Sequence, residues 1–354
     1  MSNYIEYKKK IAAHPGYLIE EIIEDKGITQ EEFAKKLGTT PKNLCLLLKG
    51  EQRLTVDIAT KLSRMIGTSV EFWLNMQSGY DAFIAKINSD KELENEKLIF
   101  KDLSLNYFAG SIKSLSNLKT LEEQIAEVRT YLFISSLSLL KNKTLALSLR
   151  NKDISLSEDE IIKSNIMVLI ASNKTMNEEA PKFNKKKLEK AAKVILSFTK
   201  HKDFYDEISK ELLKAGVVLS IVPDLKGSIV SSASKKVAGK VMLMVNDKEL
   251  TANNFWYVLF HEIGHILNDD YGVSLEHEVG EREDKVNQYA FNALISQDDY
   301  DNFKLEEDFS IEKINSFAQK IDRSPSIVLG RLEHDEIIYK SDFRVKELRY
   351  RLVI

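Results

Sequence analysis

A short polar run inside an apolar stretch constrains this chain more than any other feature. Residues 261–265 read His-Glu-Ile-Gly-His, and the other positions of residues 255–267 are apolar apart from the amphipathic Tyr257. Such a stretch predicts a helix that is buried nearly all round. Residues four apart share one helical face, so both imidazoles can reach one metal ion, with Glu262 at the adjacent edge. The alternative is a pair of core histidines that are satisfied by hydrogen bonds, since unpaired polar groups there would cost several kcal/mol.

A metal held by His261 and His265 needs a third protein ligand, and catalysis also needs an open position for water. The downstream candidates are one imidazole and five carboxylates: His277, Glu276, Glu278, Glu281, Glu283 and Asp284. Residues 282–294 predict a helix, and Glu283 lies on its apolar face, so Glu283 is the predicted third ligand. Asn287, one turn later, is expected to hold a histidine ring through its distal nitrogen. His277 is expected in an exposed loop.

These side chains predict a hydrolytic zinc centre. Zinc with three protein ligands lowers the pKa of its bound water to about 7. Glu262 is the predicted general base, which accepts a proton as that water attacks a peptide carbonyl and returns it to the leaving amine. The developing oxyanion needs a second electrophile besides the metal. His334, Tyr289 and His277 are open candidates for that role.

The helix pair around these residues resembles the ImmA/IrrE family of metallo-endopeptidases. The family pattern continues after the two-histidine motif through Glu283, Asn287 and Tyr289-Ala290, and the likeness extends over about residues 185–340. The resemblance implies a compact gluzincin-like domain with a bound Zn²⁺ ion and endopeptidase activity. The departures from the family pattern are valine, asparagine and serine in place of alanine, aspartate and proline, at Val286, Asn287 and Ser296.

A strand is predicted just before the motif helix, at residues 240–245. In gluzincin-like folds an edge strand lies beside the metal, which makes Val241, Leu243 and Val245 the predicted substrate edge strand. An extended peptide could add to that edge through backbone hydrogen bonds. The alternative is an ordinary core strand.

The N-terminal segment has the dimensions of a helix-turn-helix. Thr29 and Glu32 form a capping-box pattern before one short helix, which ends at Gly38. A second helix begins at Thr40, with proline at its first position, and closes at Gly50. In such motifs the second helix enters the major groove of DNA. The predicted DNA-contact residues are the polar and basic ones on and beside it: Thr40, Lys42, Asn43, Lys49 and Arg53.

Residues 12–85 resemble the HigA-type antitoxin branch of the Xre helix-turn-helix regulators. The likeness rests on His-Pro-Gly at 14–16 and above all on Phe-Trp-Leu-Asn-Met-Gln at 72–77. It implies a homodimer that represses transcription by binding operator DNA. Cys45 and Leu46, however, occupy positions that are usually polar, and residues 1–80 carry eleven Lys and Arg against ten Asp and Glu. The alternative is a helical module that docks protein, including a substrate, instead of DNA.

Composition limits the remaining possibilities. With 354 residues, 43% of them hydrophobic, and only 14 glycines and 5 prolines, the chain is expected to be α+β and mostly helical. Changes in the helical periodicity and composition along the chain predict three parts. These are a helix-turn-helix domain at 1–85, a helical middle region at 86–182, and a peptidase domain with a small antiparallel sheet and C-terminal helices at 183–354. The single cysteine excludes an intrachain disulfide. No apolar run is long enough to span a bilayer, so a cytoplasmic protein without membrane contact is expected.

Two functional hypotheses follow. The first is a zinc-dependent endopeptidase that is also a transcriptional regulator, which cleaves a partner protein of the repressor or antitoxin type and binds operator DNA. The second is a non-catalytic HigA-like antitoxin or transcription factor in which the metal site is structural or degenerate. A glutamate beside the first histidine favours the first hypothesis, because a purely structural site has no use for it.

Overall fold

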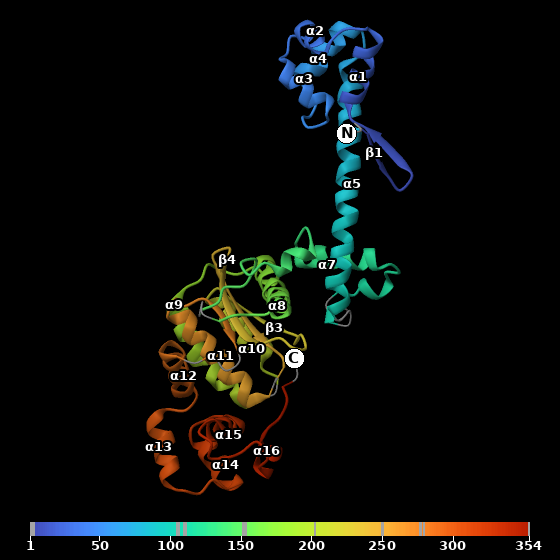
Figure 1. Ribbon diagram of the computed structural model, residues 1–354. Helices are drawn as coiled ribbons and strands as arrows, with labels where there is room; N and C mark the ends of the chain where they lie inside the picture. Colours follow the sequence, from blue (N-terminus) through green and yellow to red (C-terminus); the bar gives the residue numbers. More distant parts are fainter. Residues whose placement is uncertain are drawn as a thin grey trace. The chain divides into compact units, whose positions relative to one another are not determined.

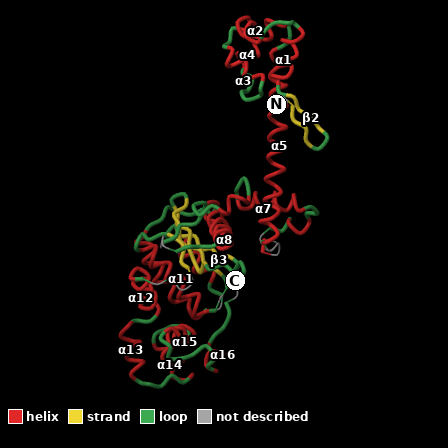
Figure 2. Tube along the Cα trace, in the orientation of Figure 1, coloured by secondary structure: helices red, strands yellow, loops and turns green. Residues whose placement is uncertain are grey.

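Contacts between residues divide the chain into two compact units, Met1–Leu98 and Ile99–Ile354. The computed structural model (Figure 1) describes residues 4–103, 107–108, 112–150, 154–201, 203–248, 251–275, 278 and 280–352. The predicted fold class, α+β and mostly helical, is confirmed, as the helices and short strands in Figure 2 show. The three-domain division of the chain stays a prediction. Within the described residues, no helix combines the length and the apolar character that a membrane span requires.

Among the described residues, the first unit contains a hairpin, four helices and most of a fifth helix, which continues past Leu98. Its elements are β1 (Tyr4–Tyr7), β2 (Lys10–Ala13), α1 (Pro15–Asp25), α2 (Gln30–Leu37), α3 (Pro41–Leu48), α4 (Val56–Ile66) and α5 (Val70–Asp102). The predicted pair of short helices is therefore α2 and α3. The Thr29 hydroxyl caps α2 by accepting from the Glu32 N–H, and Gly38 ends α2 with a φ of +68°. The Thr40 hydroxyl caps α3 in the same way.

The His-Pro-Gly run fastens α1 to α3. His14 is buried, and its Nδ1 accepts from the Gly16 N–H at 3.1 Å, which caps α1. Gly16 lies so close to α3 that a Cβ atom there would overlap the Leu47 carbonyl oxygen. The buried Trp73 completes the same core and donates from its indole nitrogen to the Thr68 hydroxyl at 2.7 Å.

Gly16→Ala is expected to lower the local free energy of unfolding of this unit by about 1–3 kcal/mol, because the added methyl group pushes α1 away from α3. Native-state hydrogen exchange of the amides in α1 and α3 measures the change. The matched control is Gly79→Ala, since a Cβ atom there would meet no described atom within 4 Å beyond its chain neighbours and the nearby backbone of its own helix. Equal exchange rates in the Gly16 variant and the wild type would contradict the packing argument.

The second unit contains a four-stranded sheet and most of the helices. Its strands are β3 (Val217–Val222), β4 (Val230–Val237), β5 (Lys240–Asn246) and β6 (Gly272–Leu275). Its helices are α7 (Leu121–Leu132), α8 (Glu158–Asn177), α9 (Lys185–Ile195), α10 (Tyr205–Lys214), α11 (Ala252–Leu267), α12 (Glu281–Leu294), α13 (Gln297–Leu305), α14 (Ile311–Lys320), α15 (Pro325–His334) and α16 (Phe343–Leu348). Short 3₁₀ turns lie at η1 (Leu115–Asn117), η2 (Leu137–Lys141) and η3 (Leu196–Lys200).

The sheet corrects two details of the sequence prediction. Its order is β3-β5-β4-β6, with β3 parallel to β5 and the other pairs antiparallel, so it is mixed and not antiparallel throughout. The strand that was predicted to be an edge, β5, is flanked by β3 and β4, and its residues Val241, Leu243 and Val245 are buried in the core. The reason is that β5 folds back onto β4 through a tight turn at Ala238 and Gly239, both with positive φ, while β3 covers its other edge.

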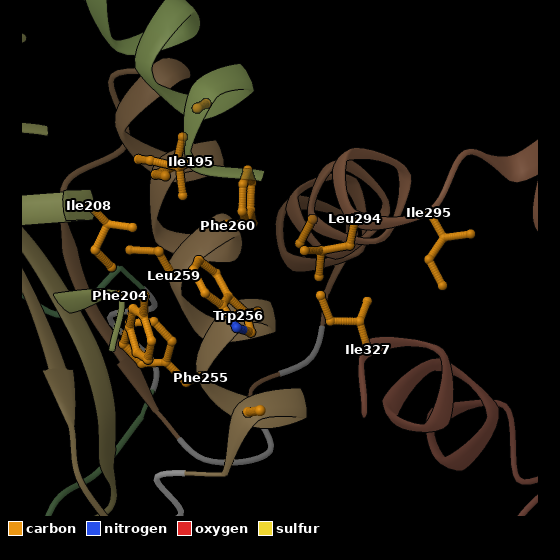
Figure 3. Close-up of a cluster of buried hydrophobic side chains, with 14 of the residues drawn as sticks. Ile195, Phe204, Ile208, Phe255, Trp256, Leu259, Phe260, Leu294, Ile295 and Ile327 are labelled. Carbon is orange, nitrogen blue, oxygen red and sulfur yellow. The ribbon is translucent and has the colours of Figure 1, made fainter. Parts of the chain in front are cut away.

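The motif helix α11 lies in the largest core cluster, as the apolar stretch predicts. Figure 3 shows Trp256 of α11 beside Phe204, which precedes α10; their ring centroids are 4.9 Å apart. Leu294 of α12 and Ile327 of α15 belong to the same cluster. Packing on several sides fixes α11 in position, and with it the polar side chains that α11 carries.

Candidate functional site

Three side chains from two helices converge on one point. His261 and His265 lie one turn apart on α11, and their Nε2 atoms are 3.0 Å apart. Glu283, in the first turn of α12, places its Oε2 atom 3.3 Å from the His261 Nε2 and 3.4 Å from the His265 Nε2. Tetrahedral zinc with bonds of about 2.0–2.1 Å has ligand atoms about 3.3 Å from one another. The separations of the three donors therefore suit one small cation.

Hydrogen bonds on the far side of each ring orient both imidazoles. The His261 Nδ1 lies 2.9 Å from Asn287 Oδ1, and the His265 Nδ1 lies 2.9 Å from Asp270 Oδ2. Because both oxygens only accept, each Nδ1 carries the proton, and in the neutral rings the lone pairs of both Nε2 atoms face each other. Two such lone pairs beside a carboxylate oxygen repel unless a positive charge lies between them. The arrangement thus fits a bound cation.

The surroundings of the Glu283 carboxylate are also those expected of a metal ligand. Glu283 is 5% exposed, and its Oε1 atom is buried with no hydrogen-bond partner among the described residues. Burial by itself raises the pKa of Glu283, but positive charge beside it, on protonated imidazoles or on a bound cation, holds that pKa well below its ordinary value. A buried, ionised carboxylate with a free oxygen needs a cationic partner.

The sequence analysis missed Asp270. It lies just beyond the end of α11, where Asp269 adopts a positive φ of 55° and turns the chain back. The Asp270 N–H then donates to the His265 carbonyl oxygen at 3.0 Å, and its carboxylate reaches the ring of the same histidine. The acidic pair that follows α11 in the sequence was the available signal. By contrast, Asn287 lies where the helical spacing from Glu283 predicted it.

Glu262, the remaining acidic residue of the motif, is fully buried and bound on both carboxylate oxygens. Arg150 donates from Nη1 to Oε1 at 3.2 Å and from Nη2 to Oε2 at 2.9 Å. The Ser232 hydroxyl donates to Oε1 at 2.9 Å, and the Ser274 hydroxyl donates to the same atom. Burial alone would raise the pKa of Glu262, but the charge and hydrogen bonds of Arg150 lower it to about 2. The role of Glu262 as a general base stays a prediction.

A cavity of about 570 Å³ adjoins the three donors. His261 and Glu283 line it, together with Tyr257 and His334. Its volume is in the range of pockets that bind small molecules or side chains. The cavity therefore leaves His261 and Glu283 accessible to a small molecule or a side chain of another protein.

The lining of the cavity shows which of the residues predicted to stabilise the oxyanion lie near the three donors. His334 lies on its wall, whereas the Tyr289 ring lies against Gly264. His277 lies outside the described residues. The sequence analysis missed Tyr257, which lines the cavity and donates from its hydroxyl to Asn287 Oδ1 at 2.6 Å.

The predicted DNA-contact residues lie on one part of the first unit. Lys42 and Asn43 are exposed in the first turn of α3, and Lys49 is exposed at its end. Thr40 acts as the helix cap. Arg53 is exposed but pairs with Asp81 at 2.5 Å.

Comparison with known proteins identifies the first unit. The model of the family described as helix-turn-helix matches residues 19–73. The uncharacterized HTH-type transcriptional regulator YddM of Escherichia coli is 37% identical over 20% of this chain and 78% of its own length. Antitoxin HigA-1 of Vibrio cholerae is 31% identical over 23% of this chain and 78% of its own length. This chain belongs to the helix-turn-helix family.

A solved structure of a HigA-family addiction module antidote protein from Coxiella burnetii is also similar to this helix-turn-helix chain. It is 34% identical over 23% of this chain and 91% of its own, with a TM-score of 0.22. The family model and the sequence relatives above confirm the predicted HigA-type helix-turn-helix domain for the N-terminal part. The family match ends at residue 73, so α11 and α12 lie outside it.

Membership of the helix-turn-helix family leaves one departure to explain. The sequence analysis expected polar residues at Cys45 and Leu46 of α3; both are half-buried. The polar residues of α3 that reach solvent are consequently Lys42 and Asn43 at one end and Lys49 at the other.

Proposed function

We propose that this chain is a zinc-dependent endopeptidase joined to a DNA-binding helix-turn-helix regulator, and that it cleaves a partner protein of the repressor or antitoxin type. The observation that carries the peptidase part is the convergence of His261, His265 and Glu283 within 3.4 Å of one another. The orientation of both rings by groups on their far side supports it further.

Different residues of the chain have different roles in the proposed peptide hydrolysis. His261, His265 and Glu283 would hold the metal, and Asn287 and Asp270 orient the two rings toward the point between them. A zinc ion bound there would supply Lewis acidity and a water molecule of lowered pKa.

Two further residues act on the substrate. Glu262 accepts the proton of the attacking water and passes it to the leaving amine. Tyr257, which lines the cavity, donates to the oxygen of the peptide carbonyl as negative charge develops there, after its hydroxyl has turned away from Asn287 Oδ1.

The second candidate function is a regulator with a structural or degenerate metal site. One observation favours it: Arg150 and two serines occupy both oxygens of Glu262. A general base needs a free lone pair. A non-catalytic protein would keep this ion pair permanently, whereas an enzyme must open it.

Metal removal separates the two candidates. The purified full chain is expected to contain about one zinc ion, and to cleave unfolded casein only while that ion is present. Elemental analysis and casein cleavage, before and after treatment with a chelator and after readdition of zinc, measure both properties. A protein that binds zinc but leaves casein intact, even when Glu262 is released from Arg150, would support the regulator instead.

The proposal for the first unit is that a homodimer binds operator DNA through α3. Family membership and the exposed Lys42 and Asn43 at the start of α3 support it. A lysine at this position contacts phosphate, and an asparagine can form two hydrogen bonds with adenine. Protein docking on the same helix is the alternative.

Asn43→Ala is expected to weaken binding to the DNA upstream of the protein's own gene by about 1–3 kcal/mol, because it removes a contact to a base edge. Lys42→Ala is expected to reduce the slope of log affinity against log salt concentration by about 1. Fluorescence anisotropy at several salt concentrations measures both changes. Lys320→Ala, on α14, removes the same charge elsewhere and serves as the control. Unchanged affinity and slope in both α3 variants would assign α3 another partner.

A further inference from the structure

Residues 146–150, which are far from β6 in the sequence, cover the edge of β6 that faces away from β4. β6 pairs with β4 on one side and forms the end of the sheet. On its other side, Leu149 forms a parallel bridge with Val273, and the Val273 N–H donates to the Ser148 carbonyl oxygen at 2.9 Å. Residues 146–150 thus occupy the position in which an extended peptide adds to a sheet edge.

The same segment delivers Arg150 into the candidate active site. The Arg150 side chain is 1% exposed, and it meets the fully buried Glu262 through two hydrogen bonds. Its Nη2 also donates to the Ser234 hydroxyl at 2.9 Å, and its Nη1 donates to the Ser274 hydroxyl. While this pair is intact, hydrogen-bond donors occupy both carboxylate oxygens of Glu262.

Further contacts fit the segment closely to the sheet. The Lys235 Nζ donates to the Ala146 carbonyl oxygen at 3.1 Å, and the Arg282 Nη1 donates to the Arg150 carbonyl oxygen at 3.2 Å. At Gly272, the first residue of β6, a Cβ atom would lie 2.8 Å from the Ser148 carbonyl oxygen and 2.6 Å from the Arg150 Cγ. Only glycine leaves room for the segment at this point.

We propose that residues 146–150 are an internal inhibitor, which occupies the β6 edge and holds Glu262 through Arg150. An extended polypeptide substrate takes the same edge and binds productively only after this segment has left it. The inference rests on the proposed peptidase function. Occupation of the β6 edge and pairing with Glu262 both act on one site, because the segment that blocks the edge also carries Arg150, which pairs with the proposed base.

Two variants release the segment in different ways. Arg150→Met removes the charge and all five N–H donors but keeps an unbranched, somewhat shorter side chain. Gly272→Ala keeps Arg150 and displaces the segment by steric overlap. Lys143→Gln, at an exposed position just before the segment, removes one charge and is the matched control. All are made in the full chain with zinc added.

Casein cleavage is expected to be at least about tenfold faster in both release variants than in the wild type, within the ~10²–10⁴-fold contribution of a general base. Trypsin cleavage after Arg150 gives a readout that needs no peptidase activity: the wild type should resist it, and Gly272→Ala should be cut readily. A synthetic peptide with the sequence of residues 145–150 should inhibit the Arg150→Met variant.

The outcomes separate the two proposals. Equal or slower casein cleavage in the release variants, beside an active wild type, would overturn the inhibitor and leave the peptidase standing. If Gly272→Ala binds zinc and is cut at Arg150, yet no variant cleaves casein, the peptidase proposal fails and the inhibitor fails with it. Rapid trypsin cleavage at Arg150 in the wild type would also contradict the inhibitor.

Discussion

His265→Ala is expected to lower the zinc affinity of the full chain by more than about a hundredfold, and to abolish casein cleavage. Changing a residue that only orients a ligand costs about 10–100-fold in metal affinity, and removing a ligand costs more. The His265 ring is fully buried, with its Nε2 atom 3.0 Å from the His261 Nε2 and 3.4 Å from the Glu283 Oε2. The alanine would leave two donors, too few for a zinc site.

Competition with a fluorescent zinc chelator measures the affinity of the His265 variant, and circular dichroism checks its fold. His334→Ala is the matched control, because His334 lines the neighbouring cavity but belongs to neither the donors nor their hydrogen-bond partners. Wild-type zinc affinity in His265→Ala would show that the metal, if bound, lies elsewhere in the chain.

Glu262→Gln is expected to keep zinc and lose cleavage by about 10²–10⁴-fold, the usual contribution of a general base. Glutamine is nearly the same size as glutamate and keeps an oxygen acceptor for Arg150 and Ser232, but it cannot take up the proton of the attacking water. The zinc donors are unchanged by this substitution. Loss of activity with zinc retained would therefore separate proton transfer from metal binding.

Glu262→Gln is best measured both in the wild type and in the Gly272→Ala variant, in which Arg150 is displaced. Glu278→Gln is the control, since Glu278 lines the cavity and, among the residues that the structure describes, its carboxylate accepts from the Leu275 N–H at 3.4 Å. Full casein cleavage by Glu262→Gln would assign the base to another residue. Full loss in the Glu278 variant would show that any carboxylate in the cavity matters equally.

Local sequence patterns anticipated the parts of the fold that depend on short-range periodicity. The apolar stretch around the two histidines predicted α11, and the spacing of Glu283 and Asn287 predicted which face of α12 turns inward. Both inferences need only the 3.6-residue helical repeat. The N-terminal helices follow from caps at Thr29 and Thr40, which satisfy backbone N–H groups within three residues.

The order of strands could not be read in this way. An unbroken apolar run such as β5 is typical of a strand with both faces covered, and it says nothing about the neighbours on either edge. Hydrogen bonds along the edges of β5 depend on where β3 and β4 return, which long-range pairing decides. The predicted substrate edge at Val241, Leu243 and Val245 failed for this reason.

The sequence by itself determined the helix-turn-helix, the buried helix with its two histidines, and the glutamate on the next helix, because each depends on residues within one or two helical turns. Only the tertiary structure decided that Arg150 meets Glu262 across 112 positions of chain and that β6 forms the sheet edge. Such a pairing produces no periodic pattern in the sequence, since it depends on the attraction and hydrogen bonds between two charges that the fold brings together and not on any local backbone preference.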